Sequence, residues 1–226
     1  MVPALEEILA ATKSMVFFGG AGVSTESGIP DFRSVDGLYH QKFKYPPETM
    51  LSHTFYETHT AEFFDFYRQK LIVHGAKPNA AHLRLAALER EGKCRAVVTQ
   101  NIDGLHQAAG SKTVYELHGS TLRNYCTRCG KFFPVQFIED AAGVGDGVPR
   151  CDECGGIVKP DVVLYEEGLD EETMENAVHA IRGADTLIVG GTSLAVYPAA
   201  GLLRYFRGEN LVVINKPVSY THLTLP

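Results

Sequence analysis

Two cysteine pairs of the form Cys-x-x-Cys constrain the fold more strongly than any other feature of the sequence. Cys126 and Cys129 form the first pair, Cys151 and Cys154 form the second, and 21 residues separate the two pairs. Each such turn directs two sulfur atoms at one ion, so two turns supply the four ligands of a tetrahedral zinc site. Because thiolates fill all four positions, none remains open for catalysis. We therefore predict one structural Zn²⁺.

A four-cysteine ribbon can instead carry out thiol redox chemistry, or bind DNA or another protein. Acidic residues offset the basic ones near the pairs, and the whole chain has a net charge of −6. This balance argues against a nucleic-acid-binding protein. The fifth cysteine, Cys94, is expected to be a small buried apolar side chain.

The N-terminal segment MVPALEEILAATK has two glutamates and no basic run, so it does not resemble a secretory signal. No apolar run approaches the roughly 18–20 residues needed to span a bilayer. We therefore expect a cytoplasmic protein with no membrane association, in which paired cysteines bind metal rather than form disulfides.

Apolar runs alternate with helical patterns along the 226 residues, and 45% of the residues are hydrophobic. The runs predict buried strands at 16–18, 94–99, 114–117, 162–165, 186–189 and 211–214. The helical patterns lie at 3–13, 62–72, 79–90, 171–181 and 198–206, with Asn79 as the N-cap of the third. This alternation is typical of a parallel α/β sheet.

Three polar loops follow three of these predicted strands directly. They read GGAGVS (19–24), TQNID (99–103) and GGTS (190–193). Ligands of open α/β sheets bind at the carboxyl ends of the strands, and the N–H groups of glycine-rich loops suit phosphates. One glycine loop alone could be a plain turn. Three loops together predict a nucleotide site, although Thr25 stands where the dinucleotide fingerprint has its third glycine.

The motifs GAGVSTESGIPDFRS, TQNIDGLH, ELHGS, the two cysteine pairs, GGTSLAVYPAA and VVIN occur here in the same order as in the sirtuins. The chain thus resembles this family of NAD-dependent protein deacylases from about residue 5 to 216, and most closely its short bacterial members. The resemblance implies a Rossmann-like parallel-sheet large domain with a small zinc-ribbon and helical insert domain. Residues 1–33, 76–122 and 159–216 would form the Rossmann-like domain. Residues 34–75 would form the helical insert of the small domain, and residues 123–158 its zinc-binding part.

The final segment, residues 217–226 (PVSYTHLTLP), has neither helical periodicity nor a strand pattern. A doubly wound domain would normally continue from a strand such as LVVIN into a further unit. The string VSYTHL also matches the translation of a common sequencing-library transposon end. We expect this tail to be non-native and the native C-terminus to be missing, with a loss of contacts to the adenine end of the cofactor.

The resemblance implies NAD⁺ as the co-substrate, held by the three loops and by the segment that follows the first. Phe32 would shield the reacting ribose carbon, Arg33 would order the loop and the phosphates, and Asp103 would accept from the carboxamide. Taken alone, Asn-Ile-Asp could be a self-bonded turn. The implied NAD⁺ contacts are Gly20, Ala21, Gly22, Ser24, Asp31, Phe32, Arg33, Gln100, Asn101, Ile102, Asp103, Gly191, Thr192, Ser193 and Asn215.

The implied reaction is attack of an acetyl-lysine carbonyl oxygen on the nicotinamide ribose carbon. An amide oxygen is a weak nucleophile, so positioning and removal of water must lower the barrier. His118 matches the base that then activates a ribose hydroxyl, and the usual pKa of histidine suits this role near neutral pH. With Asn101, Phe32 and Arg33 it makes up the implied catalytic set; alone, it would be read as a loop histidine.

Residues 160–169 resemble the sirtuin strand that pairs with the substrate backbone. Val163 and Tyr165 would line the acyl-lysine tunnel. The family usually has Gly-Glu after the aromatic residue, whereas this chain has two glutamates, which could favour basic peptides or form a solvated face. Desuccinylating sirtuins have Tyr and Arg where Phe64 and Tyr67 stand here, so we expect deacetylation over desuccinylation.

The function implied is an NAD-dependent deacetylase of acetylated lysine peptides or proteins that acts as a monomer. Two alternatives use the same nucleotide site: a mono-ADP-ribosyltransferase, and a non-catalytic module that binds NAD or ADP-ribose. A zinc-ribbon interaction module is a third, but it would not need three cofactor loops.

Overall fold

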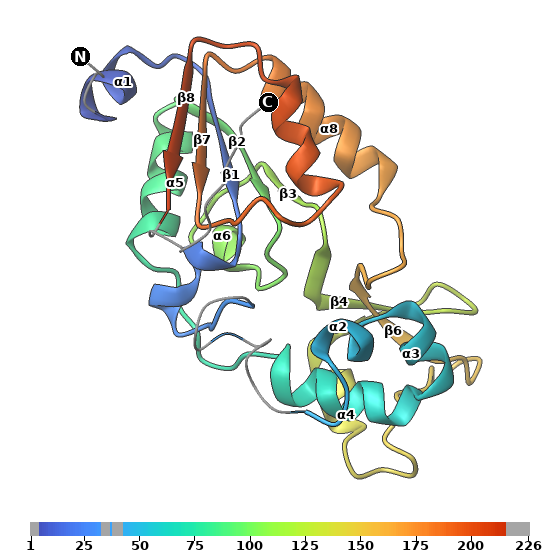
Figure 1. The fold of residues 1–226 in the computed structure, drawn as a ribbon. Helices are drawn as coiled ribbons and strands as arrows, with labels where there is room; N and C mark the ends of the chain where they lie inside the picture. The colour runs from blue at the N-terminus through green and yellow to red at the C-terminus, as the bar shows by residue number, and fades with distance from the viewer. Residues whose placement is uncertain (1–4, 33–36, 38–42, 216–226) are drawn as a thin grey trace.

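The chain folds into a large and a small lobe, each built around its own sheet (Figure 1). The structure is a computed structural model that describes residues 5–32, 37 and 43–215. Arg33 and the predicted non-native tail at 217–226 lie outside these described residues. Within them, no helix is long and apolar enough to cross a membrane.

The large lobe contains five parallel strands in the order β3-β2-β1-β7-β8. Strands β1 and β7 are buried along their whole length, which explains their continuous apolar sequences, MVFFG and TLIVG. The strand order reverses between them, so the loops at their carboxyl ends flank the crevice where such sheets bind ligands. The bounds are β1 (Met15–Gly19), β2 (Cys94–Thr99), β3 (Val114–Glu116), β7 (Thr186–Gly190) and β8 (Asn210–Ile214).

Helices cover both faces of the large sheet (Figure 1). Alternate residues of β1 point to opposite faces: Val16 and Phe18 pack with α8, while Met15 and Phe17 pack with α5. The element η4 lies beside α8. The bounds are α1 (Leu5–Ala11), η1 (Ala21–Val23), η2 (Thr25–Ser27), α5 (Ala80–Arg90), α6 (Leu105–Ala108), α8 (Glu171–Arg182) and η4 (Ala199–Tyr205).

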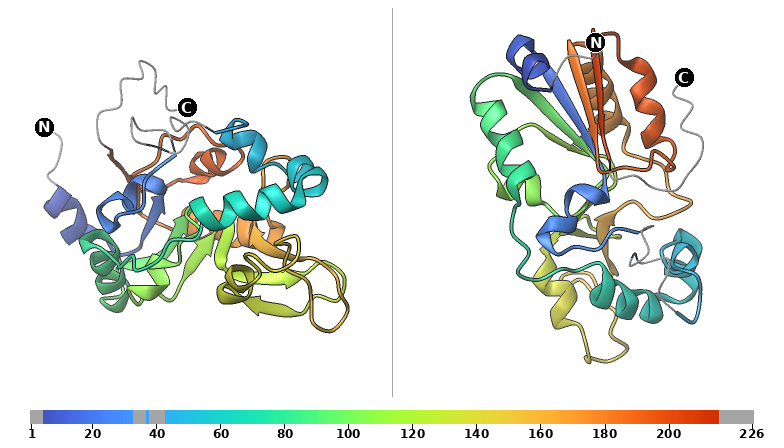
Figure 2. Two further views of the ribbon diagram at one scale, coloured as in Figure 1. Left: turned by 90° about the horizontal axis from the view of Figure 1, so that it is seen from below. Right: turned by 60° about the vertical axis from the view of Figure 1, so that its left-hand side comes forward.

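The small lobe combines two stretches that are far apart in the sequence. Its antiparallel sheet has the order β5-β4-β6, and Figure 2 shows helix α4 beside the segment that carries the cysteine pairs. Phe63, Phe64 and Tyr67 of α4 share one core with Ile138 and Val158, so both stretches fold together. The bounds are α2 (Pro47–Met50), α3 (His53–Thr58), α4 (Thr60–Lys70), β4 (Gly119–Cys126), β5 (Phe132–Pro134), α7 (Val135–Asp140) and β6 (Val158–Val162).

The predicted α/β class, parallel sheet and small second unit are confirmed. The helix predicted at 198–206 is present as the 3₁₀ helix η4. The strand predicted at 162–165 is wrong, because β6 ends at Val162 and belongs to the antiparallel sheet. The domain limits stay predictions; β4 and β6 run through those proposed at 122/123 and 158/159.

Candidate active site and metal centre

The loops after β1 and β7 pack backbone against backbone. Gly22 donates its N–H to the carbonyl of Gly191 at 2.8 Å, and Gly20 donates to that of Gly190 at 3.2 Å. A Cβ on Gly22 would lie 2.8 Å from the Gly191 Cα, and Gly191 itself has φ +60°. Glycine is therefore required here. After Gly20 the chain, beginning with Ala21, enters the short 3₁₀ turns η1 and η2 rather than an α-helix, and Thr25 begins the second of them.

Ser24 connects the first loop to the loop after β2. Its hydroxyl donates to Asp103 Oδ2 at 2.7 Å and accepts from Asn101 Nδ2 at 3.1 Å. The other oxygen of Asp103 accepts from the N–H of Leu105 at 2.9 Å. Ser24 is only 1% exposed, so its hydroxyl is committed to Asn101 and Asp103. The side chain of Ser24 thus orients those of Asn101 and Asp103, and its implied contact with NAD⁺ stays a prediction.

Thr192 links the ends of three strands. Its Oγ1 accepts from Gln100 Nε2 at 2.9 Å, and its carbonyl accepts from the side-chain amide of Asn215 after β8. Gln100 follows β2, and Thr192 follows β7. The structure therefore brings the three predicted loops together at one edge of the sheet. Ser193, next to Thr192, is exposed there.

His118 lies between β3 and β4, at the join of the two lobes. Its Nδ1 is 2.9 Å from the carbonyl oxygen of Gln100, which can only accept, so Nδ1 carries a proton. The neutral ring then has its lone pair on Nε2. Burial lowers the pKa of His118 below its ordinary 6.5, against the hydrogen bond to Gln100, which raises it. The ring is therefore neutral, and basic at Nε2, near pH 7.

Phe32 and Ile102 are partly buried and pack against the core of the small lobe. Ile102 also accepts from the N–H and the hydroxyl of Thr121 at 3.0 and 3.1 Å. Both side chains therefore lie where the lobes meet. Asp31 is likewise partly buried, whereas Arg33 is outside the described residues.

The segment after β6 continues past His118 toward α3. Val163 donates its N–H to the carbonyl of His118 at 3.0 Å. Tyr165 donates to Leu51 at 3.0 Å and accepts from the N–H of His53 at 2.9 Å. The predicted substrate residues Val163 and Tyr165 thus connect the histidine to the small lobe, and Tyr165 is 38% exposed.

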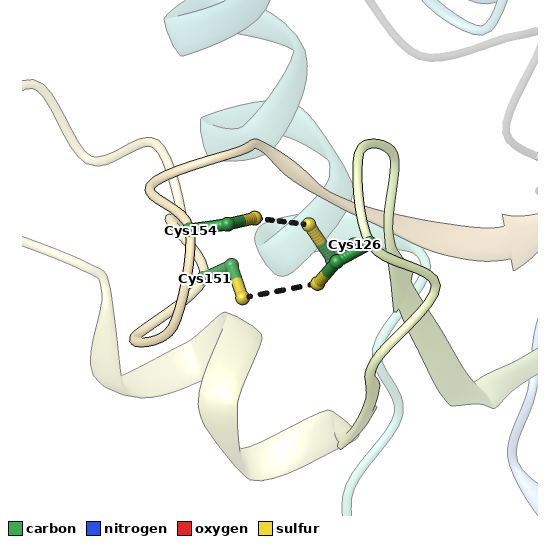
Figure 3. A group of neighbouring side chains, drawn as sticks. Cys126, Cys151 and Cys154 are labelled. Atoms are coloured by element: carbon green, nitrogen blue, oxygen red, sulfur yellow. Dashed lines mark hydrogen bonds between the residues drawn. The ribbon is translucent and has the colours of Figure 1, made fainter.

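The four paired cysteines form one cluster. Their sulfur atoms all lie within 4.8 Å of one another, with Cys126 and Cys154 at 3.3 Å and Cys129 and Cys151 at 3.7 Å. Figure 3 shows the labelled sulfurs pointing toward each other from two turns. Zn–S bonds of about 2.3 Å place tetrahedral sulfurs about 3.8 Å apart, so this donor set fits zinc. The same distances exceed a disulfide bond, which is about 2.05 Å.

The pattern of the sequence did not reveal the contribution of Asn79 to the site. It caps α5, as predicted, and its Nδ2 also donates to the carbonyl of Val23 at 2.7 Å and to Ser27 Oγ at 3.0 Å. Asn79 therefore fixes the turns η1 and η2. The only sequence signal for these contacts was the position of Asn79 at the end of the stretch Lys77-Pro78-Asn79. His82 completes the capping box and contacts His106, so both histidines have structural roles here.

Comparisons with known proteins agree with this geometry. The Sir2 family model matches residues 20–198. The chain is 64% identical over 214 residues to an NAD-dependent protein deacetylase of Clostridium acetobutylicum, and 60% identical over 215 residues to one of Clostridium perfringens. Each match covers 94% of this chain and 86% of the relative.

Solved Sir2 structures have the same fold. One that holds a deacetylated p53 peptide and 3′-O-acetyl ADP ribose matches with a TM-score of 0.84 at 40% identity, over 92% of this chain and 84% of the other. One that holds a p53 peptide and NAD⁺ matches with a TM-score of 0.81 at 40% identity, over 93% and 84%. The chain therefore belongs to the Sir2 family, the sirtuins.

Proposed function

We propose that this protein is an NAD-dependent protein-lysine deacetylase that transfers the acetyl group to ADP-ribose and releases nicotinamide. The named relatives and the Sir2 structures with NAD⁺ and peptide support this activity. The observation in this chain that carries it is the contact between His118 Nδ1 and Gln100, because Gln100 also holds Thr192 of the cofactor loops. The base and the cofactor loops are therefore held by one residue.

The glycine loops suit NAD⁺. Added Cβ atoms at Gly20 and Gly22 would meet the loop after β7, so glycine at both positions allows the two loops to approach closely. In this proposal Gly20, Ala21, Gly22, Gly191 and Thr192 form the surface against which the phosphates lie, while the N–H groups of Gly20, Gly22 and Gly191 bond within the protein.

The remaining loop residues would hold the two ends of NAD⁺. Asn101, Ile102 and Asp103, with Asp31 and Phe32, hold the nicotinamide end, while Ser193 and Asn215 hold the adenosine end. When bound, NAD⁺ supplies the electrophilic ribose carbon and the nicotinamide leaving group.

The other residues act around that carbon. His118 Nε2 takes a proton from a ribose hydroxyl, while Nδ1 stays bonded to Gln100. Phe32 and Ile102, at the join of the lobes, exclude water. The backbone between Val163 and Tyr165 pairs with the peptide and places the acetyl-lysine oxygen. The four thiolates bind zinc and thereby join the two cysteine turns of the small lobe. We also propose that the protein acts as a monomer, without nucleic acid, in the cytoplasm.

The pH dependence of the reaction follows from the pKa of His118. Burial lowers this pKa below 6.5, and only the neutral ring can accept a proton at Nε2. The rate should therefore be constant near neutral pH and fall as the pH drops through a value below 6.5. Measuring kcat/KM across about pH 5–8 checks this. A fall in kcat/KM with its midpoint above pH 6.5 would contradict this prediction.

The acyl preference follows from helix α4. Phe64 and Tyr67 are fully buried in apolar surroundings, while Arg68 donates to the carbonyls of Gly147 and Ile138 at 2.9 and 3.3 Å. The guanidinium is thus engaged elsewhere, and a succinyl carboxylate would lose its hydration without a cation. We expect kcat/KM to be at least about tenfold higher on an acetylated peptide than on its succinylated form. A preference for succinyl would overturn this prediction.

A further inference from the structure

Glu166 departs from the family pattern and from ordinary backbone geometry at once. It stands where sirtuins usually have glycine, and its φ is +76°. A residue with a Cβ is strained in this left-handed region, whereas glycine is not. Such strain persists only where surrounding contacts impose it, and it is often found at segments that clamp ligands. The contacts that hold Glu166 are therefore informative.

The Glu166 side chain reaches α3 in the small lobe. Its Oε2 accepts from the N–H of Thr54 at 2.9 Å and from the Thr54 hydroxyl at 2.7 Å. The preceding residue, Tyr165, bridges the same stretch through its backbone, with Leu51 and His53 as partners. Two successive residues therefore fasten this segment to α3.

The neighbouring carboxylate, that of Glu167, also has hydrogen-bond partners within the protein. Glu167 accepts from the N–H of Leu164 at 2.8 Å and from Lys159 Nζ at 3.1 Å, and its other oxygen lies 2.8 Å from His53 Nδ1. Both carboxylates thus have hydrogen-bond partners within the protein, although Glu166 is exposed and Glu167 only partly buried.

We propose that Glu166 is a positioning residue that fastens the peptide-docking segment, residues 163–167, to α3 before the acylated peptide arrives. This inference rests on the proposed function, which assigns peptide binding to that segment. A segment that is already ordered loses less conformational entropy on binding, so the tether tightens the complex. The tether should change the affinity for the peptide and leave NAD⁺ binding unchanged, because Glu166 does not contact the NAD⁺ loops.

Three variants test the tether. Glu166→Gly suits the backbone conformation and removes the carboxylate, Thr54→Val removes the hydroxyl donor, and Glu166→Gln keeps an acceptor oxygen. We expect the Kd for a fluorescent acetyl-lysine peptide to rise about fivefold in Thr54→Val, which loses one hydrogen bond, and at least as much in Glu166→Gly, which loses two, while the KM for NAD⁺ stays within about twofold. Glu166→Gln should remain close to the parent protein. Glu172→Gln, an exposed acid in α8, is the matched charge control.

Amide hydrogen exchange of the protein without peptide separates the tether from the enzymatic function. In Glu166→Gly, exchange should become faster at residues 163–167 and stay unchanged in β6. Unchanged exchange or an unchanged peptide Kd would overturn the proposal, as would an equal loss of NAD⁺ and peptide binding. If exchange rises but the parent protein releases no nicotinamide with acetylated peptide, the proposed function fails while the fastening of the segment stands.

Discussion

Replacing His118 by alanine is expected to lower deacetylation of an acetyl-lysine peptide by at least about a hundredfold, the usual contribution of a general base. The ring has one lone pair free at Nε2, because Nδ1 is bonded to the carbonyl of Gln100. Alanine removes this lone pair, and no other histidine in the described residues bonds to that carbonyl. The measurement is nicotinamide release from NAD⁺ in the presence of peptide, at steady state.

A matched control is His74→Ala, which removes an exposed histidine of the small lobe that pairs with Glu139. This variant should keep the parent rate. The melting temperature and zinc content of His118→Ala should equal those of the parent protein, which shows that the fold is intact. Equal rates of nicotinamide release for the parent and His118→Ala would remove the histidine from its proposed role.

Replacing Cys129 by serine is expected to remove the zinc and to lower the melting temperature by at least about 10 °C. Binding of structural zinc contributes roughly 10 kcal/mol or more to the folding of small zinc domains, and each kcal/mol shifts the melting temperature of a chain this size by about 2–4 °C. Cys129 is exposed, so serine at this position changes little besides the ligand. Elemental analysis and a thermal melt give the two readouts.

The control for this prediction is Cys94→Ala, which removes the buried thiol of β2 that lies outside the cluster. That variant should still hold one zinc per chain. Destabilisation should spread beyond the cysteines, because Cys126 and Cys151 belong to the core that also contains the α4 rings. A Cys129→Ser protein that retains full zinc content, or melts like the parent, would contradict the assignment.

The sequence predicted the three central strands of the large sheet, β1, β2 and β7, because they are buried almost throughout and therefore read as continuous apolar runs. CRAVVT was placed at the bounds of β2, and α5 begins after the predicted cap Asn79. The antiparallel strands were not predicted, for identifiable reasons. The alternation of β4 is broken by an irregularity between Ser120 and Asn124, and β6 contains Pro160, which normally argues against a strand.

The candidate site was predictable as a set of motifs but not as a network of contacts. The loops of Ser24, Asn101 and Thr192 could be placed together because parallel strands end at one edge. Several of the hydrogen bonds that join the loops connect residues about 80 or more positions apart, such as Ser24 to Asp103 or Gln100 to Thr192. Local patterns carry no information on such pairs, so the orienting role of Ser24 emerged only from the structure.

Gln100 has a consequence for how the reaction could be coordinated. Its main chain supports the imidazole, while its side chain supports the threonine at the end of β7. A displacement of that threonine would therefore act on a residue that also holds the proposed proton acceptor. In the proposed mechanism, a single side chain and its own carbonyl join the nucleotide loops to the histidine.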